Sequence, residues 1–157
     1  MTPNLEVPMP SAIVVRMNAD LITAMKAKNE PVTTALRGLK SAIKYKEVDL
    51  KRELSDPEVI DVLANQAKQR RESIEGFEKG GRAESAAAEK AELALIQAYL
   101  PAALPADELA KLIEEAVKAS GAAGPKDMGK VMAILTPQVK GRADMGEVSK
   151  AVKAKLL

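Results

Sequence analysis

The residues of this 157-residue chain best suited to chemistry are cations and glycines near its C-terminus. Cationic side chains pair with phosphate groups, and a glycine lets a phosphate approach the backbone closely. Such residues point to a phosphate backbone, such as that of RNA, as the ligand. They form two short groups: Lys126, Gly129 and Lys130, then Lys140, Gly141 and Arg142.

Charge is distributed unevenly along the chain, although its 24 basic and 22 acidic residues nearly balance. Residues 126–157 carry seven basic and three acidic side chains, a net charge of +4, whereas residues 83–115 carry two basic and seven acidic ones, a net charge of −5. A basic C-terminal unit is able to hold a phosphate backbone. Lysines near helix ends give an ordinary solvated face the same composition. The charge alone leaves both interpretations open.

The motif Asp-Met-Gly occurs at residues 127–129 and again at residues 144–146. Each copy stands where a helix is expected to begin, and Asp is a favourable N-cap whose charge suits the positive end of the helix dipole. Capping is therefore the simpler interpretation of both copies. The alternative is that the glycines open helix N-termini to an RNA phosphate. The aspartates count against it, because like charges would meet.

A second group of basic residues lies between residues 37 and 52. Arg37, Lys40 and Lys44 are spaced to share one helix face. Because Glu47 and Asp49 dilute the charge, a solvated face is the favoured interpretation. The whole group is Arg37, Lys40, Lys44, Lys46, Lys51 and Arg52.

The composition excludes several kinds of catalysis. The chain has no Cys and no His, which rules out cysteine nucleophiles, Ser-His-Asp triads, Cys/His zinc sites and histidine acid–base chemistry. No glycine-rich loop followed by Lys-Ser/Thr is present. Carboxylate-bound Mg²⁺ stays compatible with the sequence. We nevertheless predict no catalytic residue, no metal site and no cofactor, and leave open whether the chain has an activity within a larger complex.

The sequence also allows a prediction of where in the cell the protein is located. No apolar run approaches the roughly 20 residues needed to cross a bilayer. Residues 1–10 lack the basic and hydrophobic regions of a secretory signal. These features predict a cytoplasmic protein that does not bind membranes.

Hydrophobic residues recur at three- and four-residue steps, and no segment alternates as a strand would, so the fold class is predicted to be all-α. Hydrophobic residues make up 46% of the chain and aromatic ones only 2%, which limits base stacking as a binding mode. Met25, Leu50 and other apolar residues are expected to face inward. Arg70 interrupts one apolar stripe, and its guanidinium is expected to reach water. Helices are predicted at about 11–28, 31–51, 55–79, 83–99, 106–119, 127–135 and 144–155.

Prolines and glycines divide this series of helices. Two prolines, Pro101 and Pro105, prevent a continuous helix between them. The predicted organisation is a flexible leader (1–10), an N-terminal helical bundle (11–98), a linker (99–105) and a C-terminal three-helix domain (106–157). The last unit is small for independent folding.

Three stretches resemble the YqeY family. The most specific is Lys-Asp-Met-Gly-Lys-Val-Met at residues 126–132, followed by Pro137 and by Val-Lys-Gly-Arg-Ala-Asp at 139–144. The others are residues 66–77, with Lys-Gln-Arg-Arg at 68–71, and Tyr-Leu-Pro at 99–101. The resemblance covers about residues 12–157. Glu147 departs from the pattern and lowers the local positive charge.

The YqeY family is similar in fold to the tail domain of GatB, the B subunit of the tRNA-dependent amidotransferase. The resemblance therefore implies a helical bundle followed by a small GatB/YqeY-like domain, with RNA contact over residues 126–144. It does not imply catalysis, because nothing in these 157 residues corresponds to the kinase-like and amidase parts of that enzyme. A carbon–nitrogen ligase label would be inherited from the larger enzyme.

These observations lead us to expect a non-catalytic accessory protein that binds tRNA or structured RNA. Lys126, Lys130, Lys140 and Arg142 would contact phosphates, and Gly129 and Gly141 would permit close approach. The alternative is an adaptor for an amidotransferase or an aminoacyl-tRNA synthetase, based on the acidic residues 83–115 beside an Ala-rich helix. A second alternative is an amidotransferase subunit with a direct role in a reaction that uses glutamine as amide donor.

Overall fold

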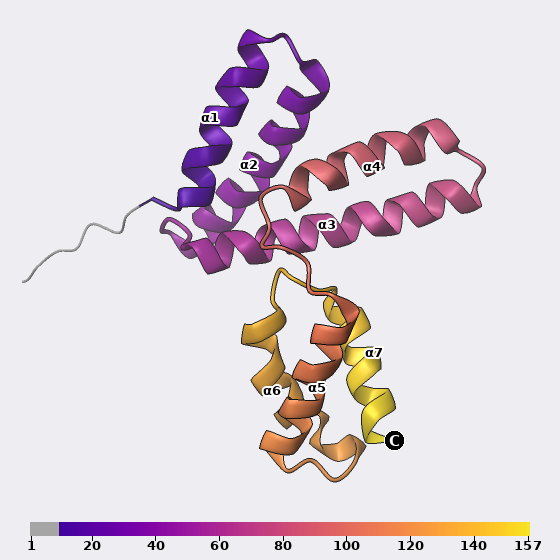
Figure 1. The fold of residues 1–157 in the computed structure, drawn as a ribbon. Helices are drawn as coiled ribbons and strands as arrows, with labels where there is room; N and C mark the ends of the chain where they lie inside the picture. The colour runs from indigo at the N-terminus through magenta and orange to yellow at the C-terminus, as the bar shows by residue number, and fades with distance from the viewer. Residues whose placement is uncertain (1–9) are drawn as a thin grey trace, which may run out of the picture. The chain divides into compact units, whose positions relative to one another are not determined.

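The structure, a computed structural model, describes residues 10–157. Within that range it contains α-helices and one short 3₁₀ turn, and no strand (Figure 1). The predicted all-α fold is confirmed. The predicted leader, apart from Pro10, lies outside the described residues. The helices are α1 (Ala12–Lys26), α2 (Glu30–Leu50), α3 (Asp56–Lys79), α4 (Ala83–Gln97), α5 (Ala106–Ser120), α6 (Met128–Val139) and α7 (Met145–Leu156).

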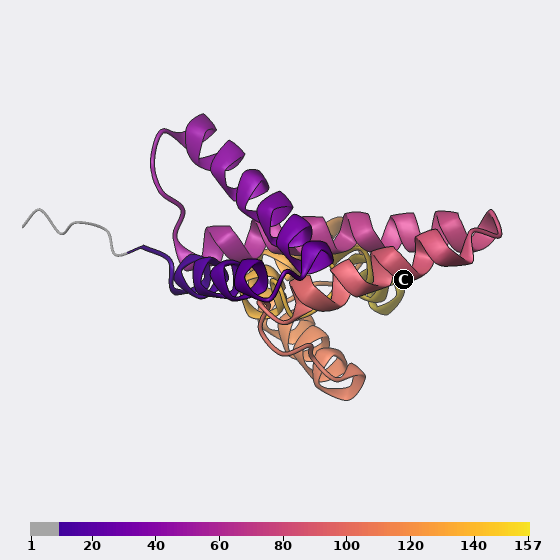
Figure 2. The same cartoon turned by 90° about the horizontal axis from the view of Figure 1, so that it is seen from above.

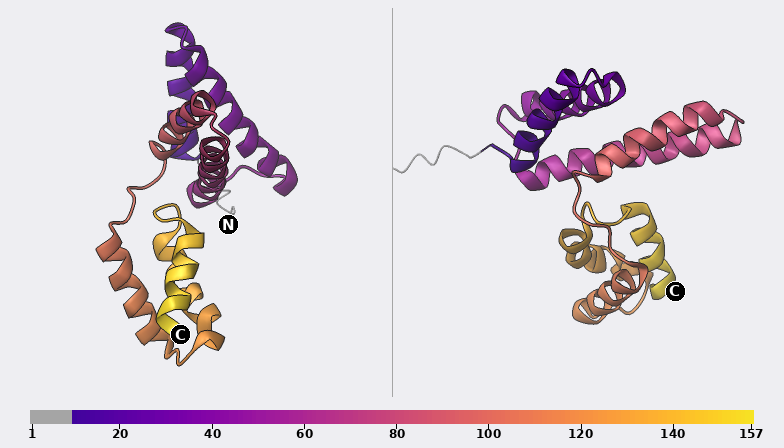
Figure 3. Two further views of the ribbon diagram at one scale, coloured as in Figure 1. Left: turned by 90° about the vertical axis from the view of Figure 1, so that its right-hand side faces the viewer. Right: turned by 45° about the horizontal axis from the view of Figure 1, so that its top comes forward.

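The chain divides into two compact units, one ending at Tyr99 and the other spanning Leu100–Leu157. In the N-terminal unit α1 packs on α2 and α3 packs on α4, and both α1 and α2 also contact α3 (Figure 3). The C-terminal unit contains α5, α6 and α7 with the 3₁₀ turn η1 (Pro125–Asp127).

Local signals in the sequence account for the start and end of most N-terminal helices. Ser11 caps α1 by accepting the N–H of Val14 (3.4 Å), and its hydroxyl donates to Asp56 at the start of α3. The carboxylate of Glu58 accepts the N–H of Ser55 (3.2 Å), as in a capping box. The helix α3 ends before Gly81, whose positive φ of 70° favours glycine.

Some apolar side chains of the N-terminal unit are buried as predicted, and others are exposed to solvent. Met17 and Leu21 are buried, but Met25 is 48% exposed and Leu50 is 38% exposed, so their predicted inward positions are wrong. The buried face of α1 passes through Ala24 instead of its neighbour Met25. Leu50 lies in the last turn of α2, beyond the last buried residue of that helix, Ile43.

The C-terminal unit is built around one apolar core. Val131, Leu135 and Val139 of α6 are fully buried, as are Val148 and Val152 of α7. Ile113 and Ala116 supply the contribution of α5. One prediction here is wrong: α6 does not stop at residues 136–137 but runs through Pro137 to Val139. Proline in the last turn removes one backbone hydrogen bond, and the burial of Val139 compensates for it.

Within residues 10–157, none of the helices has the length and apolar character that a bilayer-spanning segment needs.

Candidate RNA-binding surface

The six predicted RNA-binding residues lie at the two ends of α6. Lys126 belongs to η1, and Gly129 and Lys130 lie in the first turn of α6, whereas Lys140, Gly141 and Arg142 follow its last residue. An α-helix rises about 1.5 Å per residue, so Lys130 and Lys140 are separated by about 15 Å along the axis. The structure therefore does not bring the six residues into one cluster.

The two groups nevertheless share a side of α6. The steps from Lys130 to Ala133, Pro137 and Lys140 are three, four and three residues, which is the spacing of one helix face, and Lys126 lies in the 3₁₀ turn just before the helix. All five residues are exposed, while Val131, Leu135 and Val139 face the core. We call the exposed set, together with Gly129, the α6 face.

The middle of the α6 face is open to a ligand. Apart from the helix's own backbone, no atom lies within 4 Å of the position that a Cβ would occupy at Gly129, so glycine is not required there by packing. Ala133 is the next small exposed residue along the face. A phosphate backbone is able to approach the helix closely over this stretch, with a lysine side chain on either side.

The two Asp-Met-Gly copies differ in structure. Asp144 caps α7 as predicted, because its Oδ1 accepts the N–H groups of Gly146 (2.8 Å) and Glu147 (3.2 Å). Asp127 makes no capping hydrogen bond to α6, so the predicted second cap is wrong. Its carboxylate instead turns back and accepts the N–H of Ala123 (3.0 Å).

The hydrogen bonds of Asp127 and Asp144 affect the local charge at the starts of α6 and α7. The hydrogen bond from Ala123, followed by the attraction of Lys130, lowers the pKa of Asp127. The ionised Asp127 lies 3.6 Å from the Nζ of Lys130 and offsets part of its charge. At α7 the Asp144 carboxylate already occupies the first free N–H groups, which leaves no room there for a phosphate at the cap.

Arg142 has a role in the fold. Its Nε donates to the carbonyl of Ala102 (3.1 Å), and its own carbonyl accepts the N–H of Leu104 (2.9 Å). These bonds hold the segment before α5 against the loop after α6. Gly141, in the same loop, has a φ of 73°, which explains a glycine at this position without any ligand. Contact of either residue with RNA stays a prediction.

The fold adds lysines that sequence reasoning did not place in the site. The helices of the C-terminal unit run in alternate directions, so the ends of α5 and α7 lie near the start of α6 (Figures 1 and 3). The exposed Lys118, Lys153 and Lys155 are thereby brought to the same end as Lys126 and Lys130. The net charge of residues 126–157 carried a signal for Lys153 and Lys155 but not for Lys118, and the grouping of the three depends on the topology.

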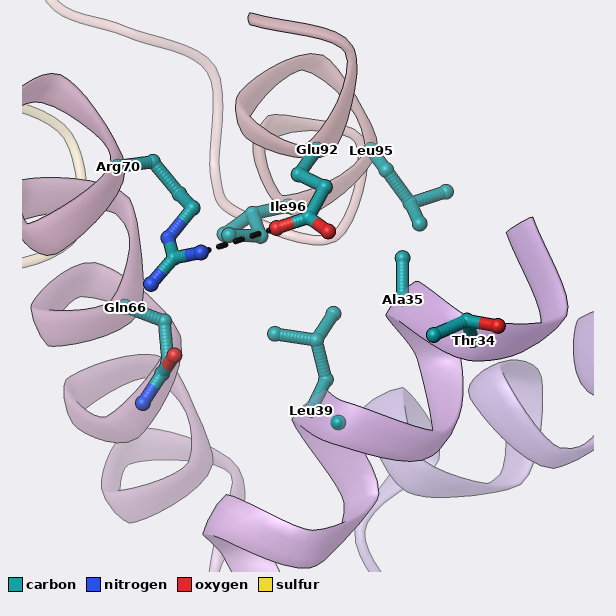
Figure 4. A pocket seen from close by; sticks show the side chains of 9 residues that line it. Thr34, Ala35, Leu39, Gln66, Arg70, Glu92, Leu95 and Ile96 are labelled. Atoms are coloured by element: carbon teal, nitrogen blue, oxygen red, sulfur yellow. Dashed lines mark hydrogen bonds and ion pairs between the residues drawn. The ribbon is translucent and has the colours of Figure 1, made fainter. Parts of the chain in front are cut away.

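The N-terminal unit holds a second polar cluster, around Arg70. Its guanidinium is predicted to reach water, and the side chain is 25% exposed, but Nη1 is also paired, at 3.0 Å from carboxylate oxygens of both Glu89 and Glu92. Figure 4 shows Arg70 and Glu92 on one side of a pocket of about 310 Å³ lined by residues of α2, α3 and α4, with Leu39 across from them.

The Arg70 cluster changes the interpretation of the acidic residues 83–115. Glu89 and Glu92 are paired with Arg70 within the fold, while Lys90, one of the two cations of the segment, is paired with Glu78 of α3 (2.6 Å). The remaining acids are divided between α4 in one unit and α5 in the other. Within residues 10–157 no group of three or more acidic side chains is arranged to hold a metal ion.

Comparison with known proteins finds one matching family model and several proteins of similar sequence. A family model described as Yqey-like protein matches residues 14–156. A protein of Eremothecium gossypii is 42% identical over 101 residues, which cover 62% of this chain and 55% of the relative. A protein of Pyrenophora tritici-repentis is 28% identical over 147 residues, covering 91% and 80%. One from Saccharomyces cerevisiae is 36% identical over 91 residues, covering 57% and 49%.

Each of these relatives is named altered inheritance of mitochondria protein 41, mitochondrial. The names point to mitochondria and contradict the prediction of a cytoplasmic protein, which is wrong on this finding. The chain spans about half the length of the Eremothecium and Saccharomyces relatives.

Proposed function

The chain belongs to the family of YqeY-like proteins, and from that premise we propose that it is a non-catalytic protein that binds tRNA or another structured RNA through its C-terminal unit. The observation that supports the proposal most is the α6 face. It places Lys130 about 15 Å from Lys140 along the helix axis, with the small residues Gly129 and Ala133 between them or beside them and Lys126 just before the helix.

The shape of this face suits a folded RNA better than a single strand. Double-stranded RNA is recognised largely through its shape, its phosphates and its 2′-hydroxyl groups. Cations at two ends of a shallow, small-residue face match phosphates on either side of an RNA groove. Lys118, Lys153 and Lys155 extend the cationic end next to the start of α6. Among structured RNAs we propose tRNA, on the resemblance of the family to the amidotransferase tail.

Binding of total tRNA to the full chain, measured by fluorescence anisotropy at 50 and 200 mM salt, tests the proposal. We expect affinity to fall steeply with salt, because each phosphate contact releases counterions. The variant Lys126→Ala/Lys130→Ala/Lys140→Ala should lower the slope of log affinity against log salt by about two to three. Arg142 is left out because its Nε serves the fold.

The matched control is Lys26→Ala/Lys68→Ala/Lys111→Ala, which removes the same charge at exposed positions that are not part of the α6 face. If both triple variants lose the same affinity, attraction is general and the α6 face is not the site. No binding at 50 mM salt would contradict the proposal. A stoichiometric protein partner that persists after ribonuclease treatment would instead favour the adaptor alternative.

A further inference from the structure

One aromatic side chain of the N-terminal unit stands outside the core. Tyr45 is 81% exposed, and Val48, three residues on, is 66% exposed. Both lie in the last turns of α2, which stand away from α3 and are joined to it by residues 51–55 (Figures 2 and 3). Within residues 10–157 no hydrogen bond or ion pair involves the Tyr45 side chain. A single exposed tyrosine is ordinary, but its surroundings are not.

Cations flank Tyr45 on both sides of the helix. Lys44 and Lys46 are its chain neighbours and project about 100° to either side of it. Lys40 and Lys44, with Ser41 between them, line a hollow of about 260 Å³ next to α1. An anionic chain lying along this face would meet a lysine on each side of the ring.

Two charged side chains of this region make contacts within the fold. Residues 37–52 contain six basic and two acidic side chains. The Oε2 of Glu47 accepts the N–H of Leu54 (3.1 Å), so this carboxylate is turned to the backbone. Arg52 is held by Glu58 through two contacts of 2.8 Å and leaves the cationic set. Arg37 and four lysines then remain against two acids. Glu47 also lines the hollow, and Asp49 lies one turn beyond Tyr45 and opposes an anion there.

We propose that the last turns of α2 are a second RNA contact, in which the ring of Tyr45 stacks on an unpaired base while Lys44 and Lys46 hold the flanking phosphates. Proteins that hold single-stranded nucleic acid combine these two features, a cationic groove and exposed aromatic rings. A bare lysine face offers no reason for an exposed ring at its centre. The inference rests on the proposed function and extends RNA contact to the N-terminal unit.

The chain carries its own reporter for this contact. It has no Trp and two Tyr. Tyr99 is 5% exposed, its hydroxyl donates to Asp20, and the guanidinium of Arg16 lies 4.6 Å from its ring centre. Of the two tyrosines, Tyr45 is therefore the one that is exposed for a base to stack on. Stacking should quench the tyrosine emission of the full chain when a 12-nucleotide uridine oligomer is added.

Three variants of the full chain separate stacking from charge. Tyr45→Ala should weaken binding of the uridine oligomer by about 5- to 150-fold, the equivalent of one stacked base. Tyr45→Phe should keep the affinity and lose the quench, because it retains a ring and removes the fluorophore. Val48→Ala is the matched control on the same exposed surface, and its affinity should stay within about twofold.

Each result decides one point. If tRNA binds as proposed above but Tyr45→Ala binds the oligomer like the unsubstituted chain, the Tyr45 contact is wrong and the C-terminal RNA site stands. If a fully paired RNA duplex quenches Tyr45 as strongly as the oligomer, stacking on an unpaired base is wrong. If neither tRNA nor the oligomer binds at low salt, the proposed function itself fails.

Discussion

A charged side chain in the middle of an apolar stripe has two physical solutions: it reaches water or it is paired. Arg70 takes the second, with two carboxylate oxygens at 3.0 Å. The sequence shows only the interruption of the stripe. Its partners, Glu89 and Glu92, come from α4, and their approach depends on how α3 and α4 align. The sequence pattern therefore identified Arg70 as an unusual residue in an apolar stripe, but its ion pairs with Glu89 and Glu92 could not be predicted from that pattern.

We expect Arg70→Met to lower the free energy of unfolding by about 1 to 3 kcal/mol, because two half-buried carboxylates lose their only shared cation. Urea denaturation followed by circular dichroism measures this. Adding Glu89→Gln and Glu92→Gln to Arg70→Met should restore most of the stability. An unchanged midpoint for Arg70→Met alone would show that the ion pairs contribute little.

The glycines of the two Asp-Met-Gly copies should respond oppositely to alanine. Gly129→Ala fills open space on a helix and should raise the free energy of unfolding by about 0.5 to 1 kcal/mol. At Gly146 a Cβ would lie 3.0 Å from the Oδ1 of Asp144, so Gly146→Ala should displace a cap and bring no gain or a loss of up to about 1 kcal/mol. Thermal melts of both variants measure the difference. Equal shifts would contradict the distinction.

Gly129→Ala also tests the α6 face without harming the fold. A methyl group added there keeps RNA phosphates farther from the helix, so weaker tRNA binding by a more stable protein would support close approach. Unchanged tRNA binding would assign the RNA contact to the lysine side chains alone.

At the scale of elements, most of the fold was open to prediction because its signals are local. Ser11, Ser55 with Glu58, and Asp144 act at helix starts as their types predict. The failures involve competition with packing. The helix α6 continues through Pro137 because burial of Val139 stabilises its last turn. The Asp127 carboxylate accepts a hydrogen bond from the N–H of Ala123 and none from the N–H groups of its own helix. Burial and loop geometry decide these cases, and neither can be read from a three-residue motif.

The start of α3 should give the protein a measurable acid response. The hydrogen bond and charge of Arg52, with hydrogen bonds from Ser55, lower the pKa of Glu58 from 4.5 to about 2. Because the folded pKa lies below the unfolded one, ionised Glu58 stabilises the fold above about pH 4.5, and this contribution is lost as the pH falls toward 2. Glu58→Gln should therefore flatten the dependence of the melting temperature on pH over this interval. A parallel shift at all pH values would contradict this assignment.

At the scale of the whole chain, the segment between the two compact units is held at one end by the loop after α6. The N–H of Leu104 and the carbonyl of Ala102 are both bonded to Arg142, so this part of the segment belongs to the C-terminal unit. Two prolines predicted a break in the helices, but no pattern in the sequence linked residues 102–104 to a loop some 40 residues later.

Arg142→Ala should loosen this segment. Loss of one hydrogen bond, worth about 0.5 to 1.5 kcal/mol, should speed amide hydrogen exchange at residues 102–104 by about 2- to 10-fold. Mass spectrometry of exchanged peptides measures it, with Lys150→Ala, an exposed position on α7, as the control. Unchanged exchange would show that the backbone bond of Leu104 is sufficient and would leave Arg142 free for a role with RNA.

The buried Tyr99 has a mechanical consequence. It is the last residue of the N-terminal unit, yet its hydroxyl is bonded to Asp20 and its ring lies beneath Arg16, both on the first helix of the chain. A pull on the C-terminal unit reaches Tyr99 along the backbone and from there loads two helices, α4 through the chain and α1 through the side chain. The first and last helices of the N-terminal unit thus share that load.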